Sequence, residues 1–285
     1  MRLNVCNLGD DDWFNYKSDI VFGLGHALQT VGHDTTIAHN RPAADRLNVL
    51  VGTDQVPLDR RLADLFTRNL ASPAFEYCVF ETEVFNGRTL NLRENFDVDL
   101  YLELLAGARF VFTPFLSNTR HYGEVGIETR YLTWGHNGGV RIYETSPSDF
   151  RFDACFVGTI KGLREQKLAA LKRSMGDRLI TVDGSVPFQF REYGEINAAS
   201  ILSIDYCAPA YPVNPFRIQR ALSNAKIVLH DHEDDADGYT RDCIKTTMEC
   251  AEIKEILAGR GAGSQRCADR SSLPFEARLR HIFNG

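Results

Sequence analysis

The sequence predicts an α/β protein of two Rossmann-like domains, each built on a parallel sheet. Its 285 residues suit two domains, since a domain typically takes about 150 residues. Short apolar runs alternate with helical stretches, which is typical of parallel strands covered on both faces. The order strand, glycine loop, helix also occurs twice, once from Leu3 and again from Ala154.

The two halves meet in a turn-rich stretch from Gly135 to Phe150. We therefore expect an N-terminal domain of residues 1–137 and a C-terminal domain of residues 138–285, with parallel sheets that face each other across a cleft. The last predicted helix, Pro274–Phe283, is a candidate to cross back to the first domain.

Apolar runs place the strands of the first half, and helical periodicity places its helices. The helix Lys17–Val31 carries Ile20, Leu24 and Leu28 on one face. It follows an acidic loop, Gly9–Asp12. The expected strands are Leu3–Leu8, Thr35–Ala38, Leu47–Val51, Tyr77–Phe80 and Phe110–Phe112. The other expected helices are Leu58–Asn69 and Leu100–Ala106.

The same signals place the elements of the second half. The helix Leu163–Met175 has leucines at helical spacing. Pro212–Pro215 introduces a helix that runs through Leu222, in which Asn214 can cap the N-terminus and Pro215 suits the first turn. The expected strands are Ala154–Val157, Leu179–Val182, Ile201–Ile204 and Ile227–Leu229. A further helix is expected over most of Tyr239–Leu257.

The acidic balance of the chain argues against broad electrostatic binding to nucleic acid or anionic membranes. Its formal net charge is −6 and its pI is about 5.8, whereas such partners favour basic surfaces. Nucleic acid is not excluded as an acceptor, because a basic pocket does not require a basic protein. No segment approaches the roughly 18 consecutive apolar residues of a membrane span.

The seven cysteines form no CxxC pair, which gives little support to a zinc or redox motif. Cys6, Cys78 and Cys155 lie in apolar, strand-like runs, so we expect buried free thiols in a reducing compartment. The N-terminal run is too short for a signal peptide and predicts a first strand. These features predict a cytoplasmic protein.

A strand that ends in glycine leads into a helix with basic residues at its start, between Phe156 and Arg164. Backbone N–H groups and the dipole at such a helix start attract anions. The backbone at Gly158 and Thr159 and the charges of Lys161 and Arg164 therefore form a candidate phosphate site. The segment matches neither the P-loop nor GxGxxG, and the alternative is a turn glycine with two solvated bases.

Two arginines, Arg217 and Arg220, stand on the first turns of the helix that follows Asn214. They lie one turn apart and share a side of the helix. Positive charge is unfavourable at the positive end of a helix dipole unless an anion binds there, so this position favours a phosphate ligand. The alternative is an exposed pair that local carboxylates neutralise.

Three segments, Asp153–Gly158, Ile196–Asp205 and Phe216–Leu229, together resemble the C-terminal half of GT-B glycosyltransferases. The likeness is closest to the group 1 and spore-maturation-type glycosyltransferase-like families. Those families share a strand that ends in an FVG turn, here Phe156-Val157-Gly158, and a later helix with the pair RI, here Arg217-Ile218. At the level of motifs, the resemblance covers roughly half of the chain.

The resemblance implies a nucleotide-sugar donor of the UDP or GDP type in the C-terminal half and an acceptor in the N-terminal half. A helix start and basic side chains would stabilise the leaving group, with no required metal or other cofactor. The donor contacts implied are Lys161, Arg164 and Arg217. Phe216 and Tyr193 either flank the base or ribose or belong to the core and rim.

One position departs from these families, which usually carry a glutamate three residues before the arginine of the RI pair. That position is Asn214 here. The change favours an alternative, a catalytically silent relative that binds a nucleotide or a glycan. A dinucleotide-dependent oxidoreductase is a third reading, but GxGxxG is missing after both first strands.

Acidic residues follow two expected strands of the first half. Asp10 and Asp12 come after the first strand, and Glu83 follows Tyr77–Phe80. Open α/β sheets bind ligands at the carboxyl ends of their strands, and an inverting transferase needs a base for the acceptor hydroxyl. Asp12, Asp10 and Glu83 are therefore candidate bases, and His136 is a further one. The alternative is a solvated acidic loop.

The run His230–Asp235 brings His, Asp and Glu close together in sequence. Such residues can bind a divalent metal, but neighbours at a strand end point to opposite sides. We therefore expect them to line the mouth of the cleft and expect no metal site.

The sequence as a whole predicts a glycosyltransferase that moves a sugar from a nucleotide sugar to a hydroxyl-bearing acceptor of unknown identity.

Overall fold

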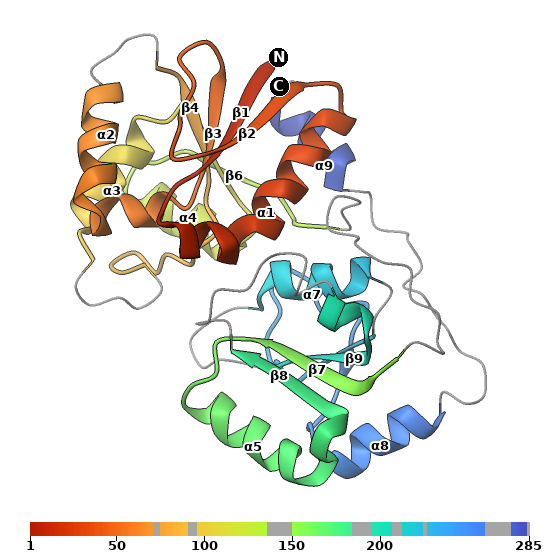
Figure 1. Cartoon of the computed structure of the whole chain (residues 1–285). Helices are drawn as coiled ribbons and strands as arrows, with labels where there is room; N and C mark the ends of the chain where they lie inside the picture. Colours follow the sequence, from red (N-terminus) through yellow and green to blue (C-terminus); the bar gives the residue numbers. More distant parts are fainter. Residues whose placement is uncertain are drawn as a thin grey trace. The chain divides into compact units, whose positions relative to one another are not determined.

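The computed structural model describes residues 1–70, 75–90, 96–135, 150–183, 195–206, 213–224, 227–259 and 275–283, with the backbone alone at residues 11–16 and 70. The chain divides into two compact units (Figure 1). Unit 1 comprises Met1–Trp134 and Pro274–Gly285, and unit 2 comprises Gly135–Leu273. None of the helices in the described ranges is long and apolar enough to cross a membrane.

Unit 1 contains a six-stranded parallel sheet with the strand order β2-β1-β3-β4-β5-β6. All residues of β3 and β4 are buried, as expected for strands with helices on both faces. The strands are β1 (Arg2–Asn7), β2 (Asp34–His39), β3 (Leu47–Val51), β4 (Tyr77–Phe80), β5 (Val111–Thr113) and β6 (Thr129–Tyr131).

Unit 1 takes its last helix, α9 (Phe275–Phe283), from the far end of the chain. The ring centroid of Phe283 lies 5.6 Å from that of Phe110 and 5.8 Å from that of Phe112, so α9 closes the core beside β5. The other helices of this unit are α1 (Asp11–Thr30), α2 (Arg60–Leu70), α3 (Val98–Ala106) and α4 (Leu116–Glu124), with a 3-10 segment, η1 (Thr53–Leu58).

Unit 2 contains a five-stranded parallel sheet with the order β11-β10-β9-β7-β8. Helices α5 and α8 cover one face of this sheet and α7 covers the other (Figure 1). The strands are β7 (Phe152–Gly158), β8 (Leu179–Asp183), β9 (Ser200–Asp205), β10 (Ile227–His230) and β11 (Ile244–Lys245). The helices are α5 (Leu163–Met175), α7 (Pro215–Ser223) and α8 (Cys250–Ala258), with a 3-10 segment, η4 (Gly176–Arg178).

The two parallel sheets confirm the predicted fold class of two Rossmann-like domains. Cys6, Cys78 and Cys155 are buried free thiols, as predicted. The predicted boundary between residues 137 and 138 lies outside the described residues. This boundary and the arrangement of the sheets across a cleft both stay predictions.

Two local predictions are wrong. The acidic loop is shorter than expected, because α1 begins at Asp11, and acidic residues are favourable in the first turn of a helix. The helix expected over most of Tyr239–Leu257 forms only toward the end of that range, as α8. Before α8 the chain turns, since Gly238 has a φ of 72° and the Thr240 hydroxyl donates to Asp235 at 2.7 Å.

Candidate functional site

The carboxyl edge of the sheet in unit 2 gathers the residues that the sequence singles out. Strand β7 ends at Gly158, β9 at Asp205 and β10 at His230. Asp205 and His230 pair across neighbouring parallel strands. This edge is where open α/β sheets bind ligands.

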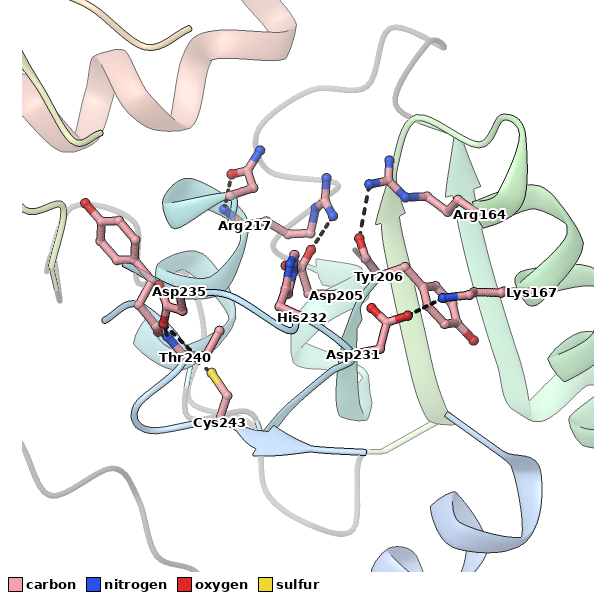
Figure 2. A network of polar contacts seen from close by, with 12 residues as sticks. Arg164, Lys167, Asp205, Tyr206, Arg217, Asp231, His232, Asp235, Thr240 and Cys243 are labelled. Carbon is pink, nitrogen blue, oxygen red and sulfur yellow. Dashed lines mark hydrogen bonds and ion pairs between the residues drawn. The ribbon is translucent and has the colours of Figure 1, made fainter. Parts of the chain in front are cut away.

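Asp205 links an arginine and a histidine at this edge (Figure 2). Its Oδ1 forms an ion pair with Nη1 of Arg217, and its Oδ2 accepts a hydrogen bond from Nε2 of His232 at 2.7 Å. The three side chains are 2%, 13% and 4% exposed, respectively. Burial opposes ionisation, but Arg217 and His232 outweigh it and hold the pKa of Asp205 below its usual value.

The guanidinium of Arg217 lies directly against the backbone at the end of β7. A Cβ at Gly158 would lie 2.9 Å from Nη2 and 3.1 Å from Cζ of Arg217. The Cζ also lies 5.4 Å from the ring centroid of Phe156. Glycine at position 158 therefore leaves room for this arginine. The interpretation of Gly158 as a simple turn residue did not predict that role.

Arg164 fastens the loop that follows β7. Its Nη1 donates to the carbonyl of Thr159 at 2.9 Å, and its Nη2 donates to the carbonyl of Tyr206 at 3.1 Å. Its guanidinium shares the Phe156 ring with Arg217, at 5.5 Å from the centroid. Arg164 thus shapes the loop and adds positive charge near Asp205. Lys161 is exposed within the same loop.

The predicted cap of α7 is confirmed. Oδ1 of Asn214 accepts a hydrogen bond from the N–H of Arg217 at 3.0 Å, and Pro215 occupies the first turn. Phe216 and Arg220 are both buried, at 8% exposed. Arg220 is therefore buried in α7, whereas the Arg217 side chain keeps partial exposure at the sheet edge.

A second ion pair lies at the same edge. Nζ of Lys167 pairs with Oδ2 of Asp231 and lies 5.4 Å from the ring centroid of Tyr206 (Figure 2). Lys167 lies on α5. Asp231 directly follows β10, so this pair joins α5 to the carboxyl end of that strand.

In unit 1, Glu83 lies in a mostly buried polar cluster after β4. Nζ of Lys17 pairs with Oε1 of Glu83 and is 2.6 Å from Oγ1 of Thr82. Glu81 accepts a hydrogen bond from the N–H of Glu83 at 2.7 Å. Burial first, and then the nearby Asp54 carboxyl, raise the pKa of Glu81 well above its usual value, which favours its protonated form.

Asp10 has a different setting from Glu83. It is exposed and lines a hollow of about 390 Å³ in unit 1. The hollow lies between the ends of β1 and β2 and the helix α2, and it also contains Gly9, His39, Asn40, Asp59, Arg61, Leu62, Leu65 and Arg68. The side chain of Asp12 and the residues Tyr193 and His136 lie outside the described residues.

Sequence reasoning missed Asp205 and His232 as partners of Arg217. Asp205 ends β9 and His232 lies just after β10. Their positions at the ends of expected strands were a usable signal, but that these two strands are neighbours was not. The His230–Asp235 run therefore supplies a hydrogen bond to Asp205. Within the described part of the chain, no group of three or more His, Cys, Asp or Glu side chains is placed to hold a metal ion.

No family model matches the sequence, and no curated protein matches it. Solved structures do share its fold. One is an "alpha-glucosyltransferase in complex with UDP and a 13-mer DNA containing a central A:G mismatch", with a TM-score of 0.57 at 10% identity, over 98% of this chain and 95% of that chain.

Two epimerases also match over nearly their whole length. UDP-GlcNAc 2-epimerase from Methanocaldococcus jannaschii has a TM-score of 0.50 at 11% identity, over 100% of both chains. A putative UDP-N-acetylglucosamine 2-epimerase from Listeria monocytogenes has a TM-score of 0.51 at 10% identity, over 100% of this chain and 98% of that chain. The chain has the GT-B fold, in agreement with the resemblance in its sequence.

Proposed function

We propose that the protein is a glycosyltransferase that uses a nucleotide-sugar donor of the UDP type. The observation that carries the proposal is the guanidinium of Arg217, which buried Asp205 fixes next to Gly158 at the carboxyl edge of the sheet. An arginine beside a backbone turn and a helix start suits a diphosphate. The alpha-glucosyltransferase of the same fold, in complex with UDP, supports this assignment.

In the proposed reaction, the bond between the anomeric carbon and the diphosphate oxygen breaks, and its electron pair goes to the diphosphate. The acceptor oxygen bonds to the anomeric carbon. Arg217, Lys161 and the N–H groups near Gly158 and Thr159 stabilise the charge on the leaving group. We propose no required metal, because these groups supply the positive charge. Arg164 keeps the loop in shape through its bond to the Thr159 carbonyl.

The proton of the acceptor hydroxyl goes to a carboxylate of unit 1. We favour Asp10 as this base, because it is exposed and lines a hollow. Glu83 is held in an ion pair by Lys17, so Glu83 ranks below Asp10. Asp12 is the remaining candidate. The acceptor is a hydroxyl-bearing molecule, and we propose a cytoplasmic location.

Thermal unfolding with added UDP tests the proposal. Ligand at 100 times its Kd stabilises the folded state by about 2.7 kcal/mol, which corresponds to about 5–10 °C in Tm for a domain of this size. We expect this shift with UDP, with UDP-sugars in parallel and GDP for comparison. Arg217→Ala should remove most of it, because UDP then binds much more weakly. Arg173→Ala, which changes an exposed arginine of α5, is the matched control and should retain it.

No shift with any nucleotide diphosphate or nucleotide sugar would refute the proposal. An equal shift in the Arg217→Ala variant would refute the site. Transfer itself is checked by mass spectrometry of a panel of hydroxyl-bearing acceptors that have been incubated with a UDP-sugar.

Two observations favour other outcomes once a nucleotide is bound. Asn214 stands where the resembling families usually have glutamate, which favours a protein that binds the donor without transferring it. The epimerase structures of the same fold favour a change at the sugar without an acceptor. Release of UDP only in the presence of an acceptor supports transfer, and conversion of UDP-GlcNAc alone supports epimerisation.

A further inference from the structure

We propose that Asp205, His232 and Gly158 are positioning residues that hold the Arg217 guanidinium in one orientation toward the diphosphate of the bound nucleotide. This inference rests on the proposed function. It adds to that function Asp205 and His232, which touch no ligand and act through Arg217, and a steric role for Gly158.

The Asp205 carboxylate has no freedom to turn. Each carboxylate oxygen has its own partner, Oδ1 on Arg217 and Oδ2 on His232. The side chain is 2% exposed, so water does not compete with either contact. Figure 2 shows the three side chains converging from different elements, the end of β9, the start of α7 and the segment after β10. Losing His232 would let the carboxylate rotate away from Arg217.

Arg217 has N–H donors besides the one that Asp205 engages. A guanidinium has five N–H donors in a fixed fork, and the ion pair with Asp205 engages Nη1. Nη2 lies over Gly158, at the end of β7. The orientation set by Asp205 thus places the rest of the fork beside the backbone turn that suits an anion.

The missing side chain at Gly158 leaves the space that the Arg217 guanidinium occupies. A Cβ at position 158 would stand 2.9 Å from Nη2, 3.1 Å from Cζ and 3.3 Å from Nε of Arg217. These are three atoms of one rigid planar group, so the group has to move as a whole. The ring centroid of Phe156 lies 5.4 Å from Cζ of Arg217, so the ring limits that movement. Gly158 therefore acts on the ligand site through the position of Arg217.

Calorimetric titration with UDP tests the inference by a double-mutant cycle. The variants are Asp205→Asn, Arg217→Ala and both together, compared with the wild-type chain. An ordered side chain that becomes mobile weakens binding by about three- to tenfold, and we expect this loss for Asp205→Asn. In the Arg217→Ala background, Asp205→Asn should cause no further loss, because the group that it positions is gone.

Variants at two further positions, His232 and Gly158, keep the test informative if Asp205→Asn does not fold. His232→Ala should weaken UDP binding, and His232→Gln should restore it, because the glutamine amide can donate to Oδ2 of Asp205. Gly158→Ala should weaken UDP binding in the wild-type chain but not in the Arg217→Ala variant. Gly259→Ala is its control, since a Cβ there meets nothing within 4 Å, and it should bind UDP normally. Uridine, which has no phosphate, should bind all variants equally.

The outcomes separate this inference from the proposed function. If the wild-type chain binds neither UDP nor GDP, the proposed function fails and the inference fails with it. If Arg217→Ala loses UDP binding while Asp205→Asn, His232→Ala and Gly158→Ala retain it, only the inference fails. Additive losses in the cycle would also overturn it, because Asp205 would then act independently of Arg217.

Discussion

Replacing Glu81 by glutamine should make unit 1 more stable at neutral pH. Glu81 is 1% exposed, and burial together with the nearby Asp54 raises its pKa well above the usual value of 4.5. The folded state therefore keeps a proton that the unfolded chain releases above pH 4.5. Glutamine has nearly the same shape, stays neutral, and can still accept the hydrogen bond from the N–H of Glu83.

The size of the effect follows from proton linkage. The contribution of Glu81 is fully present below its unfolded pKa and is lost as pH rises through its folded pKa. Over that window the free energy of unfolding should fall by about 1.4 kcal/mol for each pH unit in the wild-type chain. The Glu81→Gln variant should lack this slope, so its advantage should grow with pH across the window.

Urea unfolding at a series of pH values measures this difference. Tryptophan fluorescence follows unit 1, because both tryptophans, Trp13 and Trp134, belong to it. Glu76→Gln, an exposed change of the same chemistry, controls for loss of a surface charge. If the variant and the wild-type chain show the same pH dependence, the argument for a buried, protonated Glu81 is wrong.

Two further predictions concern stability. Phe283→Ala should destabilise unit 1 by about 3–5 kcal/mol, because its ring packs on Phe110 and Phe112; an unchanged urea midpoint for tryptophan fluorescence would contradict the placement of α9. Asn214→Ala should cost unit 2 about 1 kcal/mol through the lost cap, while Asn214→Asp should keep the cap. Calorimetric melting compares the two, and equal Tm values would show that the cap contributes nothing.

Where a segment is continuously apolar or has clear end signals, its bounds follow from the sequence. Leu47–Val51, Tyr77–Phe80 and Leu163–Met175 are predicted with the bounds that the structure has. In contrast, β6 and α4 have no such signal. The residues Thr129–Tyr131 are all half-buried, so they form no apolar run, and α4 is largely polar.

The candidate site was likewise only partly predictable from the sequence. The arginine at a helix start is a local anomaly of charge, so Arg217 is visible in the sequence. Its partner is a carboxylate, as one of the sequence alternatives holds, but the carboxylate is the buried Asp205. That partner, like His232, depends on which strands are neighbours in the sheet, β7, β9 and β10. Strand order is a property of the folded chain that no short segment encodes.

Because α9 belongs to unit 1, that unit cannot complete its core until α9 has been synthesised. Unit 2 is one continuous stretch, Gly135–Leu273, so the ribosome completes it before α9 is synthesised. Unit 1 begins first but gains Phe275 and Phe283 last, and until then Phe112 and Trp134 lack the ring contacts that α9 supplies. A nascent unit 1 therefore presents an aromatic surface throughout the synthesis of unit 2, a state in which chaperone contact or misassembly is expected.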